Sequence, residues 1–306
     1  MKKDLVSIKD LSVKEIEEIF ALTEDLKKNK EKYAQSLKGK ALALIFQKPS
    51  NRTKVSFSVG MFQLGGLGIY MGSEEINLGV REAISDVAKT LSRYVDGIVL
   101  RTFGHENVVE LARSASVPVI NGLSDLSHPC QALGDAYTIK EKLGSLEGKT
   151  LTYVGDGNNV ANSLIYCASK MGLNFNIATP KGYELDKDVV QSAKEFAGLS
   201  GAKLMITLDP RKACKAADVI YTDVWASMGQ EKEAQKRKKI FKDYQVNKKL
   251  VSCAKAGCLI MHCLPAHRGQ EITDEVIDSA NSVVFDQAEN RLHVQKAILI
   301  KLLGQA

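Results

Sequence analysis

Short apolar segments alternate with amphipathic segments along most of the chain, and this alternation limits the fold more than any other feature. Apolar runs such as Ala41–Phe46 and Thr150–Val154 have the length of buried strands, and the stretches between them have the spacing of helices. This order predicts an α/β protein with parallel sheets. We expect strands at residues 41–46, 68–71, 97–101, 118–121, 150–154, 174–178, 203–207, 219–222 and 258–262, and helices at 14–27, 131–143 and 291–303.

The turn Gly144–Gly148 divides the expected strands into two groups. The sequence therefore predicts two doubly wound domains, residues 1–146 and 147–306, each with a central parallel sheet and linked by interdomain helices. A chain of 306 residues can form two domains of ordinary size, and 44% hydrophobic with 25% charged residues is a globular composition.

The segment Lys48–Lys54 follows the first expected strand and contains groups that bind phosphate. Pro49 ends the strand, so Ser50 and the residues after it should open a helix. The free N–H groups and the dipole of a helix N-terminus attract anions. By itself, however, the segment is better explained as an ordinary helix cap.

Four further polar clusters stand at the ends of expected strands: His128–Gln131, Gly155–Asn159, Asp223–Gly229 and His262–Pro265. In open parallel sheets, ligands gather at the carboxyl ends of the strands. We therefore expect these clusters and the phosphate segment to belong to one site.

In these motifs the chain resembles the ornithine carbamoyltransferases, within the wider group that includes the aspartate enzyme. Residues 50–54 are similar to the family's phosphate motif Ser-Thr-Arg-Thr-Arg, and His-Pro-x-Gln, Asp-x-x-x-Ser-Met-Gly and His-Cys-Leu-Pro follow in the family's order. The resemblance extends nearly from end to end. It implies an enzyme that transfers the carbamoyl group of carbamoyl phosphate to the side-chain amine of L-ornithine, as a step of arginine biosynthesis or of a urea-cycle type. The products would be L-citrulline and phosphate, and no cofactor or metal is implied.

The resemblance assigns the first domain to carbamoyl phosphate. Arg52 would bind the phosphate bidentately, Arg101 would add a second guanidinium, and His128 and Gln131, one helical turn apart, would point toward the carbamoyl group. Thr53, Arg101 and His128 are the candidate donors to the oxygen of the tetrahedral intermediate. The implied carbamoyl phosphate residues are Ser50, Asn51, Arg52, Thr53, Arg101, His128, Gln131, Cys263, Leu264 and Arg291.

The resemblance assigns the second domain to ornithine. Asp223 and Ser227 would bind the α-amino group, and Asn158, Asn159 and the backbone at Met228 would bind the carboxylate. The attacking amine must be neutral, although a free alkylamine has a pKa of about 10. Desolvation, orientation by Asp223 and Cys263, or proton transfer to the departing phosphate could each favour the neutral form. The implied catalytic residues are Arg101, His128, Asp223 and Cys263.

The family's subunits form a trimer or an assembly of trimers, and a residue near Asn77 would reach the carbamoyl phosphate site of the neighbouring subunit. A C-terminal helix from about residue 290 would pack back on the first domain and carry Arg291 to its site. Three residues depart from the family's pattern: Asn51 replaces Thr, Lys54 replaces Arg, and Asn77 replaces Gln or His. Because Lys54 keeps its charge but loses the guanidinium fork, we expect the departures to affect phosphate affinity rather than the reaction.

Other classes of function receive less support. Gly155-Asp156-Gly157 begins like a dinucleotide fingerprint, but Val160 stands at the third glycine position. The formal charge of +6 and the basic stretch 231–249 invite a nucleic-acid interpretation, yet acidic residues interrupt that stretch, so we expect a solvated helix or loop. Cys258, His262 and Cys263 match no familiar zinc spacing, and we expect most of the six cysteines to be buried thiols.

The sequence also lacks an apolar run of signal-peptide or membrane-spanning length, so we expect a cytoplasmic protein that contacts neither membrane nor nucleic acid. Two alternatives stay open. One is a carbamoyltransferase for putrescine, acylated ornithine or aspartate, and a more distant one is a nicotinamide-dependent oxidoreductase.

Overall fold

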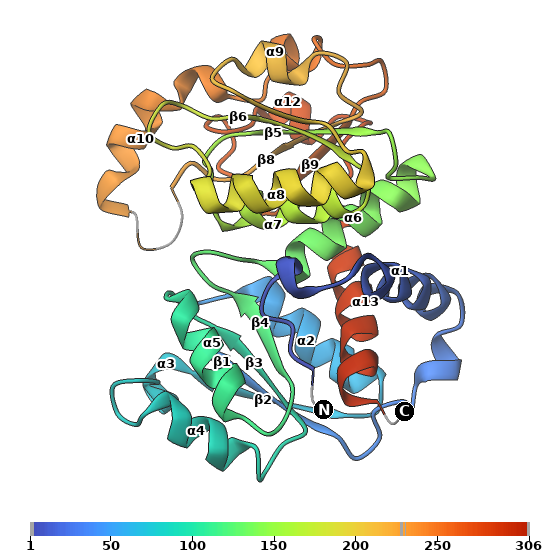
Figure 1. The fold of residues 1–306 in the computed structure, drawn as a ribbon, viewed down its shortest axis with the longest axis vertical. Helices are drawn as coiled ribbons and strands as arrows, with labels where there is room; N and C mark the ends of the chain where they lie inside the picture. The colour runs from blue at the N-terminus through green and yellow to red at the C-terminus, as the bar shows by residue number, and fades with distance from the viewer. Residues whose placement is uncertain (1–2, 227–228, 230, 305–306) are drawn as a thin grey trace. The chain divides into compact units, whose positions relative to one another are not determined.

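The computed structural model of the chain describes residues 3–226, 229 and 231–304. It contains two parallel sheets, of four and five strands, flanked by helices, so the predicted α/β fold class is confirmed. The chain divides into two compact units (Figure 1). Unit 1 comprises residues 1–137 and 289–306, and unit 2 comprises residues 138–288.

The sheet of unit 1 has the order β2-β1-β3-β4. Its strands are β1 (Ala41–Phe46), β2 (Leu67–Gly72), β3 (Gly97–Arg101) and β4 (Val119–Leu123), and every pair is parallel. The central strands β1 and β3 are almost wholly buried. Because both of their faces are covered, they appear in the sequence as continuous apolar runs rather than alternating ones.

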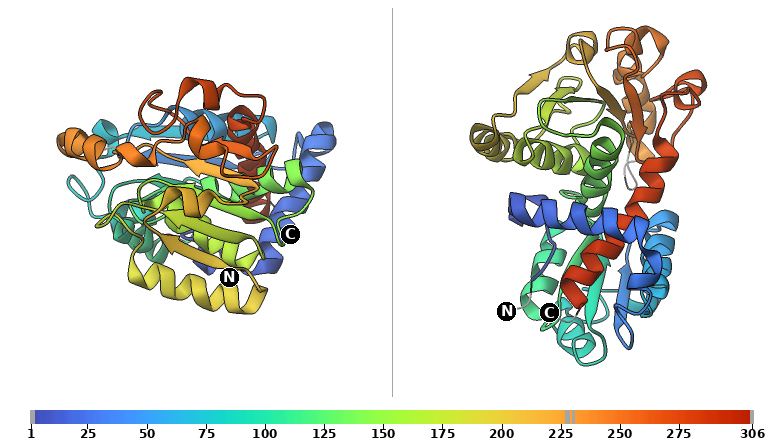
Figure 2. Two further views of the ribbon diagram at one scale, coloured as in Figure 1. Left: turned by 90° about the horizontal axis from the view of Figure 1, so that it is seen from above. Right: turned by 90° about the vertical axis from the view of Figure 1, so that its right-hand side faces the viewer.

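Helices cover both faces of this sheet. Helices α4 (Ile84–Leu91) and α5 (His105–Ser114) pack on one face, where their apolar side chains join those of β1 and β3 in a common core. Helix α2 (Asn51–Gln63) is joined to α13 (Val284–Leu303) by a hydrogen bond from Lys296 Nζ to Gln63 Oε1 of 2.9 Å. Helix α1 (Val13–Lys28) lies beside α13 and pairs Glu18 with Lys301 (Figures 1 and 2).

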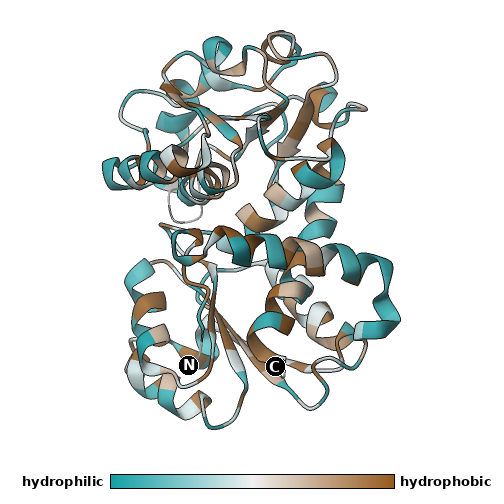
Figure 3. Ribbon diagram, turned by 45° about the vertical axis from the view of Figure 1, so that its right-hand side comes forward, coloured by the Kyte–Doolittle hydropathy of each residue, from teal (hydrophilic) through white to brown (hydrophobic). Residues whose placement is uncertain are grey.

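The sheet of unit 2 has the order β7-β6-β5-β8-β9. Its strands are β5 (Thr150–Val154), β6 (Asn174–Ala178), β7 (Leu204–Thr207), β8 (Val219–Thr222) and β9 (Leu259–His262), again all parallel. Helices α7 (Asn159–Lys170) and α8 (Lys187–Ser200) lie on one face, and α9 (Pro210–Cys214) and α12 (Asp274–Ile277) on the other (Figure 1). Hydrophobic residues are concentrated in the strands of both sheets (Figure 3).

The remaining helices are short or connect the two groups of strands. Helix α6 (Pro129–Leu143) begins in unit 1 and ends in unit 2, and α3 (Ser73–Ile76), α10 (Ala234–Ile240) and α11 (Lys248–Val251) complete the α-helices of the described residues. Short 3-10 helices span Ile8–Asp10, Lys30–Tyr33, Glu231–Glu233 and Lys242–Tyr244.

The expected strands agree with the observed ones to within two residues at each end, but two expectations need correction. The last helix begins at Val284 rather than at 291, because its first turns carry the buried polar residues Gln287 and Asn290, which an apolar pattern does not reveal. The basic stretch 231–249 is also not simply solvated. Arg237, Phe241 and Tyr244 within it are buried.

Cysteine burial largely follows the expectation. Cys130, Cys167, Cys214 and Cys258 are buried free thiols, whereas Cys253 and Cys263 are only partly buried. Burial raises the pKa of Cys130 and of Cys258 to about 12. A thiol with so high a pKa is a poor nucleophile at neutral pH, so these side chains are core residues. No helix of the described residues has both the length and the apolar character needed to cross a membrane.

Candidate active site

The phosphate segment forms the N-terminus of α2, as the sequence predicts. Ser50 is the N-cap, and its Oγ accepts a hydrogen bond of 3.2 Å from the backbone N–H of Thr53. Ser50 therefore has the ordinary capping role as well as its place in the motif. The first turn of a helix carries N–H groups without intrahelical partners, and Asn51 and Arg52 occupy this turn in unit 1.

Three arginines gather at this helix terminus. Arg101 is the last residue of β3 and is 5% exposed, and Arg291 of α13 is 4% exposed and donates from Nη2 to Thr53 Oγ1 at 2.9 Å. Burial, together with the charges of Arg291 and Arg52, lowers the pKa of Arg101 to about 10. Three cations held this closely repel one another, so a multiply charged anion bound among them would be strongly favoured.

His128 and Gln131 lie at the start of α6, beside the arginine cluster. His128 is buried, and burial together with the charges of Arg291 and Arg101 holds its pKa well below the usual value. It is therefore neutral at pH 7 and can donate one ring N–H. Gln131 is 1% exposed and donates from Nε2 to Asp135 Oδ1 at 2.8 Å, which leaves Oε1 as the acceptor end of its amide. The pair can thus offer a donor and an acceptor to a planar amide.

The low pKa of His128 predicts acid sensitivity. Because the unfolded chain binds a proton near pH 6.5 and buried His128 does not, the stability that His128 contributes is present above about pH 6.5 and is lost as the pH falls below it. The pKa values of His105 and His293 are lowered by burial as well. We expect the melting temperature to fall between pH 7 and pH 5, and to fall less in His128→Gln. Identical pH dependence in both proteins would contradict this assignment.

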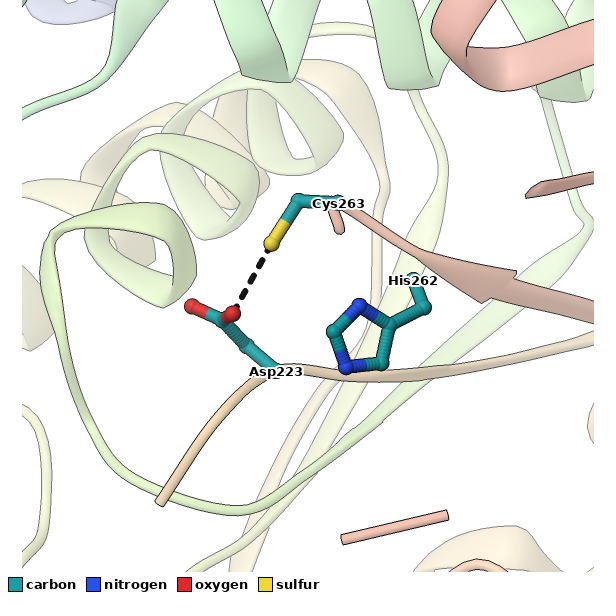
Figure 4. Close-up of side chains that lie close together, drawn as sticks. All are labelled: Asp223, His262 and Cys263. Atoms are coloured by element: carbon teal, nitrogen blue, oxygen red, sulfur yellow. Dashed lines mark hydrogen bonds between the residues drawn. The ribbon is translucent and has the colours of Figure 1, made fainter. Parts of the chain in front are cut away.

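In unit 2, Asp223 and Cys263 are brought together by neighbouring parallel strands. Thr222 ends β8 opposite His262 at the end of β9, so the residues that follow them emerge side by side. Cys263 Sγ donates to Asp223 Oδ1 at 2.8 Å (Figure 4). Asn158 Nδ2 donates to Asp223 Oδ2, also at 2.8 Å. Asp223 is only 6% exposed, so this carboxylate is a nearly buried acceptor held by several donors.

His262 holds the segment that follows Cys263 through hydrogen bonds of its ring. Its Nδ1 accepts from the backbone N–H of Leu264 at 2.9 Å, and its Nε2 lies 3.2 Å from Glu271 Oε1; both side chains are fully buried. The Leu264–Pro265 peptide is cis. Ligand atoms of Asp223, His262 and Cys263 lie within 4.8 Å of one another and resemble a metal site. Both ring nitrogens of His262 are already engaged, however, which leaves too few ligands for a zinc centre.

The glycine segment 155–157 does not form a dinucleotide site. Asn158 caps α7, and its Oδ1 accepts from the N–H groups of Val160 and Ala161 at 3.0 and 3.1 Å. These are the groups that a pyrophosphate would need. A Cβ on Gly157 would lie 2.6 Å from the backbone of Glu184, so Gly157 serves close packing of the chain. The structure thus gives the nicotinamide alternative no support.

Other candidate residues are placed as follows. Asn159 is the first residue of α7, half-buried, and Asn77 is exposed at the C-terminal end of α3. Cys263 and Leu264 belong to unit 2, whereas the other carbamoyl phosphate candidates belong to unit 1. Ser227 and Met228 lie outside the described residues.

Two cations of the phosphate segment are engaged elsewhere. Lys48 is 3% exposed, forms an ion pair with Asp125 and lies 4.2 Å from the ring centroid of Phe103. Lys54 lies 3.5 Å from the ring centroid of Tyr70. Lys48 therefore fixes the end of β1, and Lys54 makes a cation–π contact in place of the forked bonds of an arginine.

Sequence reasoning missed Arg237, which anchors α10 in unit 2. Its Nη1 donates to Asp156 Oδ2 at 2.8 Å and to the Trp225 carbonyl at 2.9 Å. Its guanidinium carbon lies 4.8 Å from the centroid of the Tyr183 ring. No sequence signal separates this arginine from the exposed lysines beside it. Only the weak pattern of apolar residues around it, Trp225 and Phe241, could have suggested a buried partner.

The fold and the two groups of polar residues are those of a carbamoyl-group transferase. Residues 3–141 match the aspartate/ornithine carbamoyltransferase carbamoyl-P binding domain, and residues 147–302 match the Asp/Orn binding domain of the same family. The chain therefore belongs to the aspartate/ornithine carbamoyltransferase family.

Among its relatives are ornithine carbamoyltransferases. The chain is 56% identical to that of Thermococcus kodakarensis over 304 residues, which covers 99% of this chain and 96% of the relative. It is 54% identical to the anabolic ornithine carbamoyltransferase of Pyrococcus furiosus over 307 residues, with 99% and 96% covered. The solved structure of ornithine carbamoyltransferase from Pyrococcus furiosus superposes with a TM-score of 0.97 at 53% identity and covers 100% of this chain and 98% of that one.

Proposed function

We infer that this chain is an ornithine carbamoyltransferase, which transfers the carbamoyl group of carbamoyl phosphate to the side-chain amine of L-ornithine and gives L-citrulline and phosphate. Full-length identity of 54% and 56% to enzymes of that name supports this function. The observation that carries it is the arginine cluster at the N-terminus of α2, within the unit that matches a carbamoyl-P binding domain. The anabolic relative fits a role in arginine biosynthesis, although one site can serve either direction.

We propose that Ser50, Asn51, Arg52, Thr53 and Arg291 bind the phosphate group, and that Arg101, His128 and Gln131 bind the carbamoyl group. The dianion would relieve the repulsion among the arginines, which together with burial lowers the pKa of Arg101. Arg101, His128 and Thr53 would donate to the carbonyl oxygen as it gains charge in the tetrahedral intermediate. Gln131 Oε1 and the backbone carbonyls of Cys263 and Leu264 would accept from the carbamoyl nitrogen.

Phosphate binding should stabilise the protein measurably. A ligand present at about one hundred times its dissociation constant adds about 2.7 kcal/mol, which corresponds to a rise of several degrees in melting temperature for a chain of this size. We expect inorganic phosphate and carbamoyl phosphate to raise the melting temperature at constant ionic strength, and chloride to have little effect. Calorimetry of Arg52→Ala provides the control, because this variant should lose most of the rise. An equal rise in the variant would place the anion elsewhere.

In unit 2 we propose that Asp223, with Ser227, binds the α-amino group of ornithine, and that Asn158, Asn159 and the backbone of Met228 bind its carboxylate. Cys263 holds its proton against Asp223, so it is arranged as a donor rather than as a thiolate nucleophile. Direct attack by the amine therefore needs fewer steps than a thioester. The departing phosphate is the proposed proton acceptor, since it is the nearest strong base that the reaction itself produces.

Substrate preference tests the proposed function. Citrulline formation would be assayed with ornithine, acetylornithine, putrescine and aspartate as competing acceptors, with carbamoyl phosphate held constant. We expect ornithine to be preferred strongly, because Asp223 supplies a buried negative partner for an α-ammonium group. Preference for putrescine or for an acylated ornithine would move the chain to another acceptor class within the family.

We propose that the chain assembles as a homotrimer or a multiple of one, in which Asn77 reaches the neighbouring carbamoyl phosphate site. Large apolar side chains are exposed along α2 and the edge strand β2, namely Val55, Phe62, Leu67 and Ile69, with Phe62 80% exposed. A second copy would cover such a patch. Light scattering should give a mass at least three times the 33.5 kDa of one chain. A monomer would overturn the proposal.

We also propose a cytoplasmic location, which cell fractionation tests.

A further inference from the structure

Gln47 lies directly after β1 and directly before the phosphate segment. Its backbone N–H donates to the Arg101 carbonyl at 2.8 Å, which extends the pairing of β1 with β3. Its side chain bonds to two other segments of unit 1. Nε2 donates to the Leu78 carbonyl at 2.9 Å, and Oε1 accepts from Thr102 Oγ1.

These contacts form a chain of hydrogen bonds in which each side chain donates to the next residue. Asn107 Nδ2 donates to Thr102 Oγ1 at 3.2 Å, so the hydroxyl proton of Thr102 is free to go to Gln47. Gln47 then has its acceptor toward Thr102 and its donor toward Leu78. An amide satisfies both ends, whereas a carboxylate could accept from Thr102 but could not donate to Leu78.

Leu78 is the anchor of an otherwise exposed segment. Among residues 73–83 only Leu78 is buried, at 2% exposure, and it packs with Ile84 and Val87. Asn77, its neighbour in the chain, is exposed and has a φ of 38°. The Asn77 carbonyl accepts from two N–H groups of the following turn, both at 3.0 Å. The bond from Gln47 therefore holds Leu78, the residue next to Asn77. The backbone of Asn77 is fixed by its own turn, and its side chain is exposed to solvent.

We propose that Gln47 is a positioning residue, which holds Asn77 in place for the carbamoyl phosphate site of the neighbouring subunit. This inference rests on the trimer and the shared site proposed above. It also implies a physical link between sites, because the same residue is bonded to β3 beside Arg101 of its own subunit and to the segment that serves the next one.

Two substitutions remove the donor to Leu78. Gln47→Glu keeps the size and the bond from Thr102, and Gln47→Met removes both polar contacts without adding charge. We expect each to lower kcat/KM for carbamoyl phosphate about tenfold, as loss of one hydrogen bond to a positioned segment can do. Gln63→Glu is the matched control. It adds the same charge to unit 1 but keeps the contact with Lys296, and its activity should be unchanged.

Mixed trimers separate a role in the neighbouring site from a role within the subunit. Each variant is mixed with Arg52→Ala, which should be nearly inactive alone. In a shared site, Arg52 comes from one subunit and Asn77 from the next, so random mixing restores roughly a quarter of the sites. Asn77→Ala with Arg52→Ala tests the shared site itself. Gln47→Glu with Arg52→Ala should recover to the same level if Gln47 acts only through Asn77.

The outcomes are distinct. Recovery of both mixtures to about a quarter of the wild-type activity supports the inference. If the Asn77→Ala mixture recovers but the Gln47→Glu mixture stays near the average of its parents, roughly a twentieth, Gln47 acts in its own subunit and the inference is wrong. If neither mixture recovers, the shared site is wrong and the inference falls with it, while citrulline formation by the wild type still stands.

Discussion

Replacement of Arg101 by methionine is expected to lower kcat/KM for carbamoyl phosphate by about two to three orders of magnitude, since loss of one preorganised donor to an oxyanion costs about 3–4 kcal/mol. Arg101 is 5% exposed at the end of β3, so water cannot replace it easily. Methionine keeps the length of the side chain and favours burial. The fold should therefore be retained. Because one of three clustered cations is removed, repulsion in the folded state decreases, and the melting temperature should equal or exceed that of the wild type.

The pattern of kinetic effects identifies the role of Arg101. Arg101→Lys keeps a charge but not the fork, so it should retain more activity than Arg101→Met. Arg113→Met changes an exposed arginine of the same unit and should leave the rate unaffected. Steady-state rates at varied carbamoyl phosphate measure the effect. If Arg101→Met falls within threefold of the wild type, the donor to the developing charge must be another group, and His128 would be next.

The fold was predictable because apolar patterning reports burial directly. Strands β1 and β3 are buried on both faces, and such strands appear as unbroken apolar runs. The carboxyl-end rule for parallel strands then placed Arg101, Asp223 and Cys263 at strand ends, where they are found. The start of α13 was missed, because Gln287 and Asn290 are polar and yet buried.

The polar supports of the site were not predictable, because their partners are distant in the chain. Lys48 begins the segment that the sequence associates with phosphate, yet it pairs with Asp125, 77 residues away. Arg237 lies among solvated lysines but bonds Asp156, 81 residues away. Gln47 donates a hydrogen bond to the Leu78 carbonyl, but in the sequence it cannot be told apart from a glutamine exposed on the surface. Residue type alone cannot distinguish a buried polar group from an exposed one. That distinction needs the tertiary contact.

Replacement of Asp223 by asparagine is expected to lower kcat/KM for ornithine by about a thousandfold, because removing one partner of a buried charge pair costs about 3–5 kcal/mol. Asparagine has the same shape but no charge to offer an ammonium group. Cys263 Sγ–H and Asn158 Nδ2–H each donate to Asp223 at 2.8 Å. The N–H groups of an asparagine amide would face one of these two donors and would have no acceptor there. Asp243→Asn is the control, since Asp243 is exposed in the same unit.

An ornithine analogue that lacks the side-chain amine separates the two roles open to Asp223. If the carboxylate binds the α-amino group, the analogue should inhibit the wild type and lose its affinity in Asp223→Asn, because its α-ammonium group is the part recognised. If the carboxylate instead orients the attacking amine, the analogue should bind both proteins equally while turnover still falls. Cys263→Ala should have a smaller effect on either measurement, since it removes a donor to Asp223 and leaves the charge in place. Unchanged ornithine kinetics in Asp223→Asn would exclude both roles and place the substrate amines away from the junction of β8 and β9.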